Sequence, residues 1–186
     1  MSVGASKRSG RATEEPGRGG RERGSEPGTQ GIQLTEQEAW ERIRGAHTAI
    51  VTTLKADGWP VALPSWFVVD GSDIYLRTPA KSRKVLRISR DPRASFLIES
   101  GRAWVELTAV QLSCEATVLD RALDREQAVR VAELSDTKYA GFSLPTAGLP
   151  AATAAHYGSG MATIRLRPVG PPLTWDNSRI RLATHR

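Results

Sequence analysis

The sequence predicts a mainly β fold, in which an antiparallel sheet closes or nearly closes into a barrel. Strand-like segments outnumber helical ones by about six to three, and they are short and evenly spaced. Turn dipeptides such as Asp57-Gly58 and Asp70-Gly71 separate them and favour hairpins. With 186 residues, of which 39% are hydrophobic, the chain is long enough for one domain with its own core. We expect this domain to cover residues 32–186.

Residues 1–31 are expected to form a disordered, Gly- and Arg-rich tail. They hold 8 of the 17 glycines, six cations and four acids, and almost nothing apolar after Val3. Such a segment buries too little surface to offset the entropy lost on ordering. Its Arg-Gly pairs are typical of nucleic-acid-binding tails, but its small net charge does not favour nucleic acid as a partner.

The first half of the domain predicts one helix followed by three strands. Thr35 and Glu38 have the spacing of a capping box, which starts a helix that ends near Gly45. β-Branched and apolar residues predict strands at residues 47–54, 59–69 and 73–78. The Asp-Gly turns between them predict an antiparallel meander, and Pro60 and Pro64 place parts of the second strand at an edge or a bulge.

The second half predicts two helices among further strands. An amphipathic helix over residues 81–90 must end before Asp91-Pro92. A second helix over residues 124–139 places Val131 and Leu134 on its apolar side. The remaining strands are expected at residues 94–99, 104–120, 161–167 and 173–180. Residues 140–160, which contain Pro and Gly, are expected to form a loop.

The composition excludes several kinds of site. One cysteine, Cys114, excludes an intrachain disulfide framework and a Cys-based zinc site, and the three histidines lack metal-ligand spacing. No run approaches 18 apolar residues and no apolar segment marks the N-terminus, so we expect a cytoplasmic protein without a membrane partner. No nucleophile triad or carboxylate pair is recognisable, so the catalytic residue is unknown.

Four stretches of the chain together resemble one known family. They are residues 49–60, 64–78, 82–95 and 174–176. The most specific runs from Ser82-Arg83-Lys84-Val85-Leu86 to Arg90-Asp91-Pro92-Arg93-Ala94-Ser95. Their order and spacing resemble the pyridoxamine 5'-phosphate oxidase-like split β-barrel family of flavin and deazaflavin oxidoreductases. The resemblance implies an antiparallel split barrel of the FMN-binding type. Cys114-Glu115-Ala116 departs from the family's usual Gly-x-Ala.

A flavin-type cofactor needs a cationic cradle for its phosphate, donors along its heterocycle and a flat apolar wall. Residues 78–84 offer hydroxyls and cations at the start of a helix, where backbone N–H groups and the helix dipole favour anions. The resemblance implies phosphate contacts from Lys84 and Ser82, with additional contacts from Arg83 and Thr78. The alternative interpretation is a solvated cationic helix face.

The resemblance also implies that the cofactor ring lies beside the backbone of Pro64, Ser65 and Trp66. The alternative for Trp66 is ordinary packing in the barrel core, because strand residues alternate between the two faces of a sheet. Proteins of this family are homodimers with cofactor sites at the subunit interface. Trp104 and Trp175 are therefore expected at that interface, where packing is their main role.

The function that the resemblance implies is an oxidoreductase, which binds the deazaflavin coenzyme F-420 or FMN and passes hydride to a small conjugated acceptor. The acidic oligoglutamate tail of the deazaflavin needs cations beyond the phosphate cradle. Cations available for such a groove are Lys55, Arg77, Arg87, Arg179 and Arg181. We therefore favour the deazaflavin. The alternative is a non-catalytic protein that binds or senses FMN, haem or another tetrapyrrole.

Overall fold

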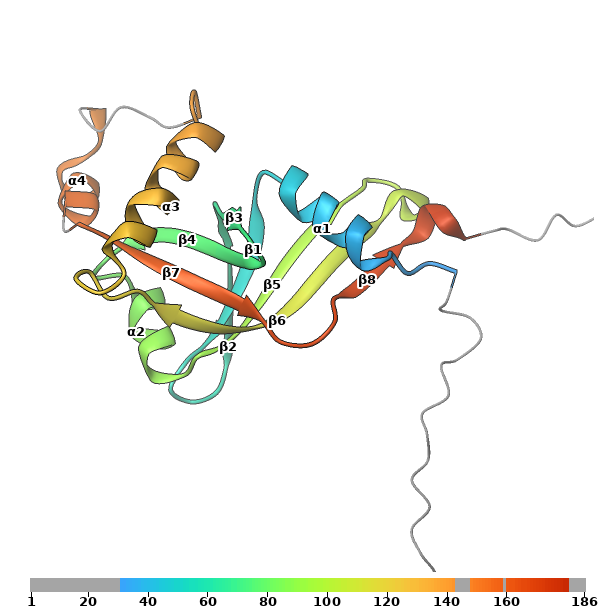
Figure 1. Cartoon of the computed structure of the whole chain (residues 1–186), viewed down its shortest axis with the longest axis horizontal. Helices are drawn as coiled ribbons and strands as arrows, with labels where there is room; N and C mark the ends of the chain where they lie inside the picture. Colours follow the sequence, from blue (N-terminus) through green and yellow to red (C-terminus); the bar gives the residue numbers. More distant parts are fainter. Residues whose placement is uncertain (1–30, 143–147, 159, 181–186) are drawn as a thin grey trace, which may run out of the picture.

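The computed structural model describes residues 31–142, 148–158 and 160–180. Its main feature is an eight-stranded antiparallel sheet that curls into a half-barrel (Figure 1). The strands pair in the order β2-β1-β5-β6-β7-β4-β3, and β8 pairs with β6. Their bounds are Ala49–Leu54 (β1), Pro60–Ser65 (β2), Val68–Asp70 (β3), Asp73–Pro79 (β4), Arg93–Ser100 (β5), Thr108–Val118 (β6), Met161–Pro168 (β7) and Leu173–Asp176 (β8). The mainly β, split-barrel fold is confirmed.

Within the described residues, four α-helices lie around the sheet (Figure 1). They are Glu36–Gly45 (α1), Arg83–Arg90 (α2), Arg125–Lys138 (α3) and Ala151–Gly158 (α4). Helix α1 packs against β6, α2 against β1 and β6, α3 against β3, and α4 against β4. In the described part of the chain, no helix is both long enough and apolar enough to cross a membrane. The expected tail, apart from Gly31, lies outside the described residues.

Helix α1 starts where the capping box predicts. The Thr35 hydroxyl accepts from the backbone N–H of Glu38 (3.3 Å), and the Glu38 carboxylate accepts from the backbone N–H of Thr35 (2.8 Å). Ala39 and Ile43, one helical turn apart, are fully buried against the sheet. The local signals at this helix were therefore sufficient to predict its start and its end at Gly45.

The predicted meander is wrong, because the expected strand over residues 59–69 is two strands at opposite ends of the sheet. β2 pairs with β1 and β3 pairs with β4, and three other strands lie between these two hairpins. The break falls at Trp66 and Phe67. Both the N–H and the C=O of Phe67 contact the hydroxyl of Tyr139, each at 2.8 Å, in place of a neighbouring strand. The edge position predicted from Pro60 and Pro64 is correct for β2.

Two predicted strands are shorter than expected. Residues Trp104–Glu106 form a 3-10 turn (η1), because the Glu106 carboxylate accepts from the backbone N–H groups of Arg102 (3.1 Å) and Ala103 (3.2 Å). Near the end of the described chain, Asn177–Arg179 also form a 3-10 turn (η3), which the Asp176 side chain caps by accepting from the Ser178 N–H (3.1 Å). In both cases a local side-chain acceptor competes with strand pairing.

Other boundaries also differ from the prediction. β1 begins at Ala49, so His47 and Thr48 precede it. The segment expected to be a loop contains α4, whose start is rich in alanine, the residue with the highest helix propensity. The prediction of a loop gave more weight to the Pro and Gly residues that surround this alanine-rich stretch.

The apolar core divides into two clusters. The larger lies between the inner face of the sheet and α1 and α2, and there Phe67 meets Phe96 edge to face at 4.9 Å. Cys114 belongs to this cluster, and burial raises the pKa of its thiol to about 12, so its role is packing. The smaller cluster lies under α3 and is formed by Val68, Tyr75, Leu119, Val131 and Tyr139.

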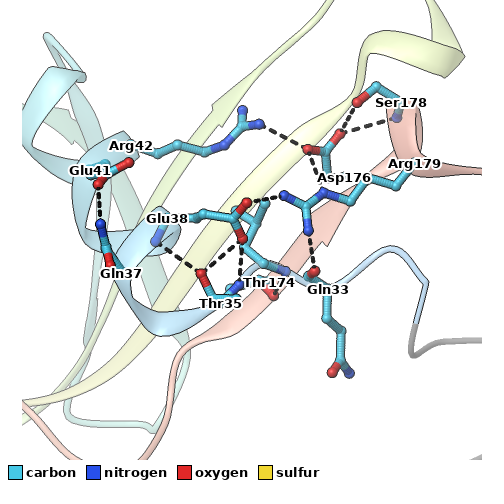
Figure 2. Close-up of polar contacts among 11 residues, drawn as sticks. Gln33, Thr35, Gln37, Glu38, Glu41, Arg42, Thr174, Asp176, Ser178 and Arg179 are labelled. Atoms are coloured by element: carbon cyan, nitrogen blue, oxygen red, sulfur yellow. Dashed lines mark hydrogen bonds and ion pairs between the residues drawn. The ribbon is translucent and has the colours of Figure 1, made fainter.

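Polar contacts join the two ends of the described chain (Figure 2). The backbone N–H of Leu34 donates to the Thr174 hydroxyl (2.9 Å), and Arg179 donates to the backbone carbonyl of Gln33 (2.8 Å). Arg179 also pairs with the carboxylate of Glu38. The Asp176 side chain is only 4% exposed and pairs with arginines from both ends, one of them Arg179 at 3.4 Å. Arg179 is therefore fully engaged in holding the fold.

Candidate functional site

The site is built where β4 leads into α2. Ser82 is the N-cap of α2, and its hydroxyl accepts from the backbone N–H of Val85 (3.4 Å). The Thr78 hydroxyl, at the end of β4, donates to the Ser82 hydroxyl (3.3 Å). The first turn of α2 carries no acidic residue, so no carboxylate of its own offsets the positive end of the helix dipole. This helix start therefore favours an anion.

Lys84 brings the main charge to this helix start. Its side chain is half-buried, and its ammonium donates to the hydroxyl of Ser65 in β2. Burial lowers the pKa of Lys84, and the nearby charge of Arg87 lowers it further. Among the described residues, no carboxylate lies within ion-pair distance of Lys84. Partial burial of a cation without an anionic partner costs free energy, and an anion placed beside Lys84 would reduce that cost.

Lys84 lines a cavity of about 380 Å³. Five of the seven residues predicted to bind the cofactor line it, and they are Pro64, Ser65, Trp66, Thr78 and Lys84. Ser82 lies beside the cavity through its hydrogen bond with Thr78. Arg83 is exposed and faces a different cavity. The cradle predicted from the sequence is thus assembled around Lys84, without Arg83.

Trp66 forms the aromatic wall of this cavity. Its side chain is 41% exposed, whereas the neighbouring Phe67 is 1% exposed. Of these two residues, Phe67 is therefore the one that packs in the core. Trp66 stacks on Tyr139 with ring centroids 4.2 Å apart and an interplanar angle of 3°. Trp66 thus presents apolar aromatic surface to a ligand.

Sequence reasoning missed the side of the cavity that α3 supplies. Ser135, Asp136 and Tyr139 lie there, and Arg77 of β4 pairs with the Asp136 carboxylate (3.0 Å). The sequence predicted α3 but gave no signal that its last turns would face residues about 60 positions earlier. Pro79 and Met161 complete the lining. The charge of Arg77 is therefore offset within the cavity, whereas that of Lys84 is not.

A second cavity, of about 480 Å³, lies between α2 and the β1–β2 turn. Four cations and one carboxylate line it, and they are Lys55, Arg83, Arg87, Arg90 and Asp57. The half-buried Arg87 donates to the Thr53 hydroxyl (2.7 Å), and burial lowers its pKa, with further lowering by Arg83 and Arg90. Two of the five cations proposed for an anionic groove, Lys55 and Arg87, therefore meet here.

The other three proposed groove cations do not join them. Arg77 pairs with Asp136 and Arg179 pairs with Glu38 and Asp176, so both are neutralised within the fold. Arg181 lies outside the described residues. Within the described ranges, no group of three or more His, Cys, Asp or Glu side chains is placed to hold a metal ion.

Strand β8, which carries Trp175, lies at the opposite end of the sheet from α3 and α4 (Figure 1). Trp104 lies in η1 and is joined to Trp175 through Asn177. Trp104 and Trp175 are 61% and 46% exposed. Asn177 joins them, because its side chain accepts from the Trp175 indole N–H and donates to the backbone carbonyl of Trp104 (2.6 Å). Exposed apolar side chains around them are Val105, Leu107 and Leu173. Together these side chains form an exposed apolar surface, in which the hydrogen bonds of Asn177 hold Trp175 and the backbone of Trp104 in place.

The curled antiparallel half-barrel is the fold of the split-barrel class of proteins. The comparison with protein families gives the same result, because residues 35–155 match the model described as pyridoxamine 5'-phosphate oxidase. The chain belongs to this family. The resemblance noted in the sequence is therefore confirmed.

Solved structures share the fold at low sequence identity. A conserved hypothetical protein, Rv2991, from Mycobacterium tuberculosis is 24% identical with a TM-score of 0.66, over 84% of this chain and 96% of that chain. A FAD-binding protein from Mesorhizobium loti is 11% identical with a TM-score of 0.56, over 75% and 92%. The heme storage protein HutZ from Vibrio cholerae is 13% identical with a TM-score of 0.51, over 76% and 96%. No curated protein matches the sequence.

Proposed function

We propose that the protein binds a phosphate-bearing flavin-type cofactor in the cavity beside α2 and acts as an oxidoreductase. The observation that carries the proposal is Lys84, a half-buried cation bonded to the Ser65 hydroxyl with no carboxylate among the described residues near it. A phosphate at the start of α2 supplies the missing negative charge. The FAD-binding protein among the structural neighbours supports a flavin-type ring.

The chain's own residues would hold such a cofactor by its two ends. Lys84, Ser82 and Thr78 bind and orient the phosphate, and Trp66 covers one side of the ring and keeps water from it. When bound, the cofactor supplies hydride transfer to a small conjugated acceptor. The protein then needs no catalytic side chain of its own, which agrees with the absence of a recognisable acid–base pair in the sequence.

The deazaflavin coenzyme F-420 is our preferred cofactor over FMN. In the second cavity Lys55 pairs with Asp57 (3.3 Å), whereas Arg83, Arg87 and Arg90 have no carboxylate of the described residues within ion-pair distance. These three cations exceed what a ligand that ends at its phosphate requires, which supports the preference. Lys84 and Arg87 lie one turn apart on α2, so the two cavities are on neighbouring faces of one helix. A ligand with an acidic tail can use both. The cytoplasmic location expected from the sequence stays a prediction.

We further propose a homodimer in which a second copy covers Trp104 and Trp175. Large aromatic side chains held in place by hydrogen bonds are typical of interface cores, and Leu173 extends the same face of β8. Light scattering should report twice the 20.2 kDa mass of the chain. A monomer at micromolar concentration would remove this interface role.

A non-catalytic storage or sensing protein is the alternative, supported by the heme storage protein among the neighbours. Haem iron needs an axial ligand. Of the described residues that line the cavity, Met161 and Tyr139 are the candidates, and the Tyr139 hydroxyl already contacts backbone groups. Met161 is thus the remaining candidate ligand for haem, whereas Lys84 offers a flavin phosphate a cation with no carboxylate partner among the described residues. Turnover of reduced cofactor with acceptor present separates an enzyme from a storage protein.

The test of cofactor binding is Lys84→Ala, with Lys81→Ala as the matched control. Lys81 lies three residues earlier, is exposed and lines neither cavity. Loss of one charge-assisted contact costs roughly 1.5–3 kcal/mol, or about ten- to a hundredfold in Kd. Each variant is titrated with FMN and with the deazaflavin at two salt concentrations, and circular dichroism verifies folding. Unchanged affinity in folded Lys84→Ala would mean that the segment is a solvated cationic helix face.

A further inference from the structure

Tyr139 joins the aromatic wall of the cavity to helix α3. Its ring is parallel to that of Trp66, with 3° between the planes and 4.2 Å between the centroids. Tyr139 is 3% exposed, whereas Trp66 is 41% exposed. Since Tyr139 covers one face of the indole, the exposed surface of Trp66 is its other face and its edges. The imidazole of His47 meets Trp66 edge-on, with centroids 6.1 Å apart.

The hydroxyl of Tyr139 is held by the main chain. It accepts from the backbone N–H of Phe67 (2.8 Å) and lies within donor distance of the carbonyls of Phe67 (2.8 Å) and His47 (2.9 Å). A hydroxyl has one proton, so it donates to one carbonyl at a time. These bonds fix the bend between β2 and β3, where Trp66 lies. One residue therefore fixes both the backbone and the ring plane of Trp66.

We propose that Tyr139 is a positioning residue that presets the plane of Trp66 for the cofactor ring, an inference that rests on the proposed function. Exposed aromatic side chains lose rotamer freedom when a ligand stacks on them. A Trp66 already fixed by a buried neighbour avoids that loss, so the ring binds more tightly. Tyr139 acts through the indole, and it leaves recognition of the phosphate to Lys84.

The test separates recognition of the ring from recognition of the phosphate. Tyr139→Leu removes both the stack and the hydroxyl, and Tyr139→Phe removes the hydroxyl alone. The matched control is Tyr75→Phe, because Tyr75 is buried in the same apolar cluster and does not line the cavity. Each protein is titrated with the deazaflavin, with FMN, with riboflavin as a ring without phosphate, and with inorganic phosphate. The circular dichroism band of the bound ring is recorded alongside.

We expect Tyr139→Leu to weaken binding of riboflavin, FMN and the deazaflavin about tenfold and to diminish the induced circular dichroism band. Binding of inorganic phosphate should not change. Tyr139→Phe should give a smaller effect in the same direction, and it carries the test if Tyr139→Leu does not fold. Tyr75→Phe should bind every probe as the wild-type protein does.

A double-substitution cycle tests whether Tyr139 acts through Trp66. If it does, the protein with both Trp66→Leu and Tyr139→Leu binds FMN no more weakly than Trp66→Leu alone. Independent, additive effects would overturn the proposal, as would equal losses for FMN and inorganic phosphate, or no loss in either Tyr139 variant. Failure of the wild-type protein to bind FMN or the deazaflavin would instead refute the proposed function itself.

Discussion

Asp136 holds Arg77, the second cation of the cavity proposed to bind the cofactor, in an ion pair, and its replacement should increase affinity for phosphate. Its carboxylate lies 3.0 Å from the Arg77 guanidinium, and both residues line the cavity that contains Lys84. The Asp136 side chain is 77% exposed, so the pair contributes at most about 1 kcal/mol to folding. Asp136→Asn should therefore fold normally while it removes a negative charge and releases Arg77.

A released Arg77 can donate to a phosphate beside Lys84. A hydrogen bond between charged groups is worth about 1.5–3 kcal/mol, and solvent exposure at Arg77 reduces this to about 1–2 kcal/mol, or about five- to thirtyfold in Kd. Isothermal titration with inorganic phosphate and with FMN measures the gain, which should shrink at high salt.

Glu133→Gln is the control for the charge change in Asp136→Asn, because Glu133 is an exposed acid on the same helix that does not line the cavity. Equal gains in phosphate affinity in both variants would show that only the overall electrostatic field of the protein changed. No gain in Asp136→Asn would show that Arg77 does not reach the bound phosphate, and the reasoning from the cavity lining would be refuted.

Two further predictions concern stability. Gly101 has φ 107°, and an added Cβ would lie 2.4 Å from the carbonyl oxygen of Glu106, so Gly101→Ala should cost more than about 2 kcal/mol in thermal or urea unfolding. Gly71 has φ 63° and no atom near an added Cβ, so Gly71→Ala should cost only the backbone strain of about 1–2 kcal/mol. Equal losses of stability in the two variants would mean that the chain shifts to relieve the contact between the Cβ added at Gly101 and the Glu106 carbonyl, and would contradict the prediction for Gly101→Ala. Burial alone would raise the pKa of Asp176, but hydrogen bonds from Ser178 and the charges of two arginines lower it. The pKa of Glu38 is lowered to about 2. The stability that these carboxylates add is present above their ordinary pKa values and is lost as the pH falls through their lowered pKa values, so Asp176→Asn should flatten acid unfolding measured by circular dichroism.

The parts of the site that are local in sequence were predictable. The cradle lies in the seven residues from Thr78 to Lys84, where a strand end, an N-cap and a cation follow one another along the chain. The capping box of α1 was predictable for the same reason. Such features depend on backbone geometry over a single turn, so residue type and spacing are enough.

The features that depend on distant residues were not predictable. β2 and β3 separate because the hydrogen-bonding groups of Phe67 are satisfied by Tyr139, 72 residues later. The same long-range contact brings α3 to the cavity and converts Arg77 from a free cation into half of an ion pair. Neither side-chain periodicity nor turn type reports which far residue will supply such a partner.

The contacts between the two ends of the described chain have a consequence for synthesis. Leu34 bonds with Thr174 and Gln33 with Arg179, at separations of 140 and 146 residues. During synthesis on the ribosome, the segment that leads into α1 is made early, but it cannot bond with Thr174 and Arg179 until nearly all of the described domain has been made. Until then the buried face of α1 is held to the sheet without these bonds. Folding should therefore complete only after residues 174–179 have been made, and a chain truncated before residue 174 should lack both bonds to the segment that leads into α1.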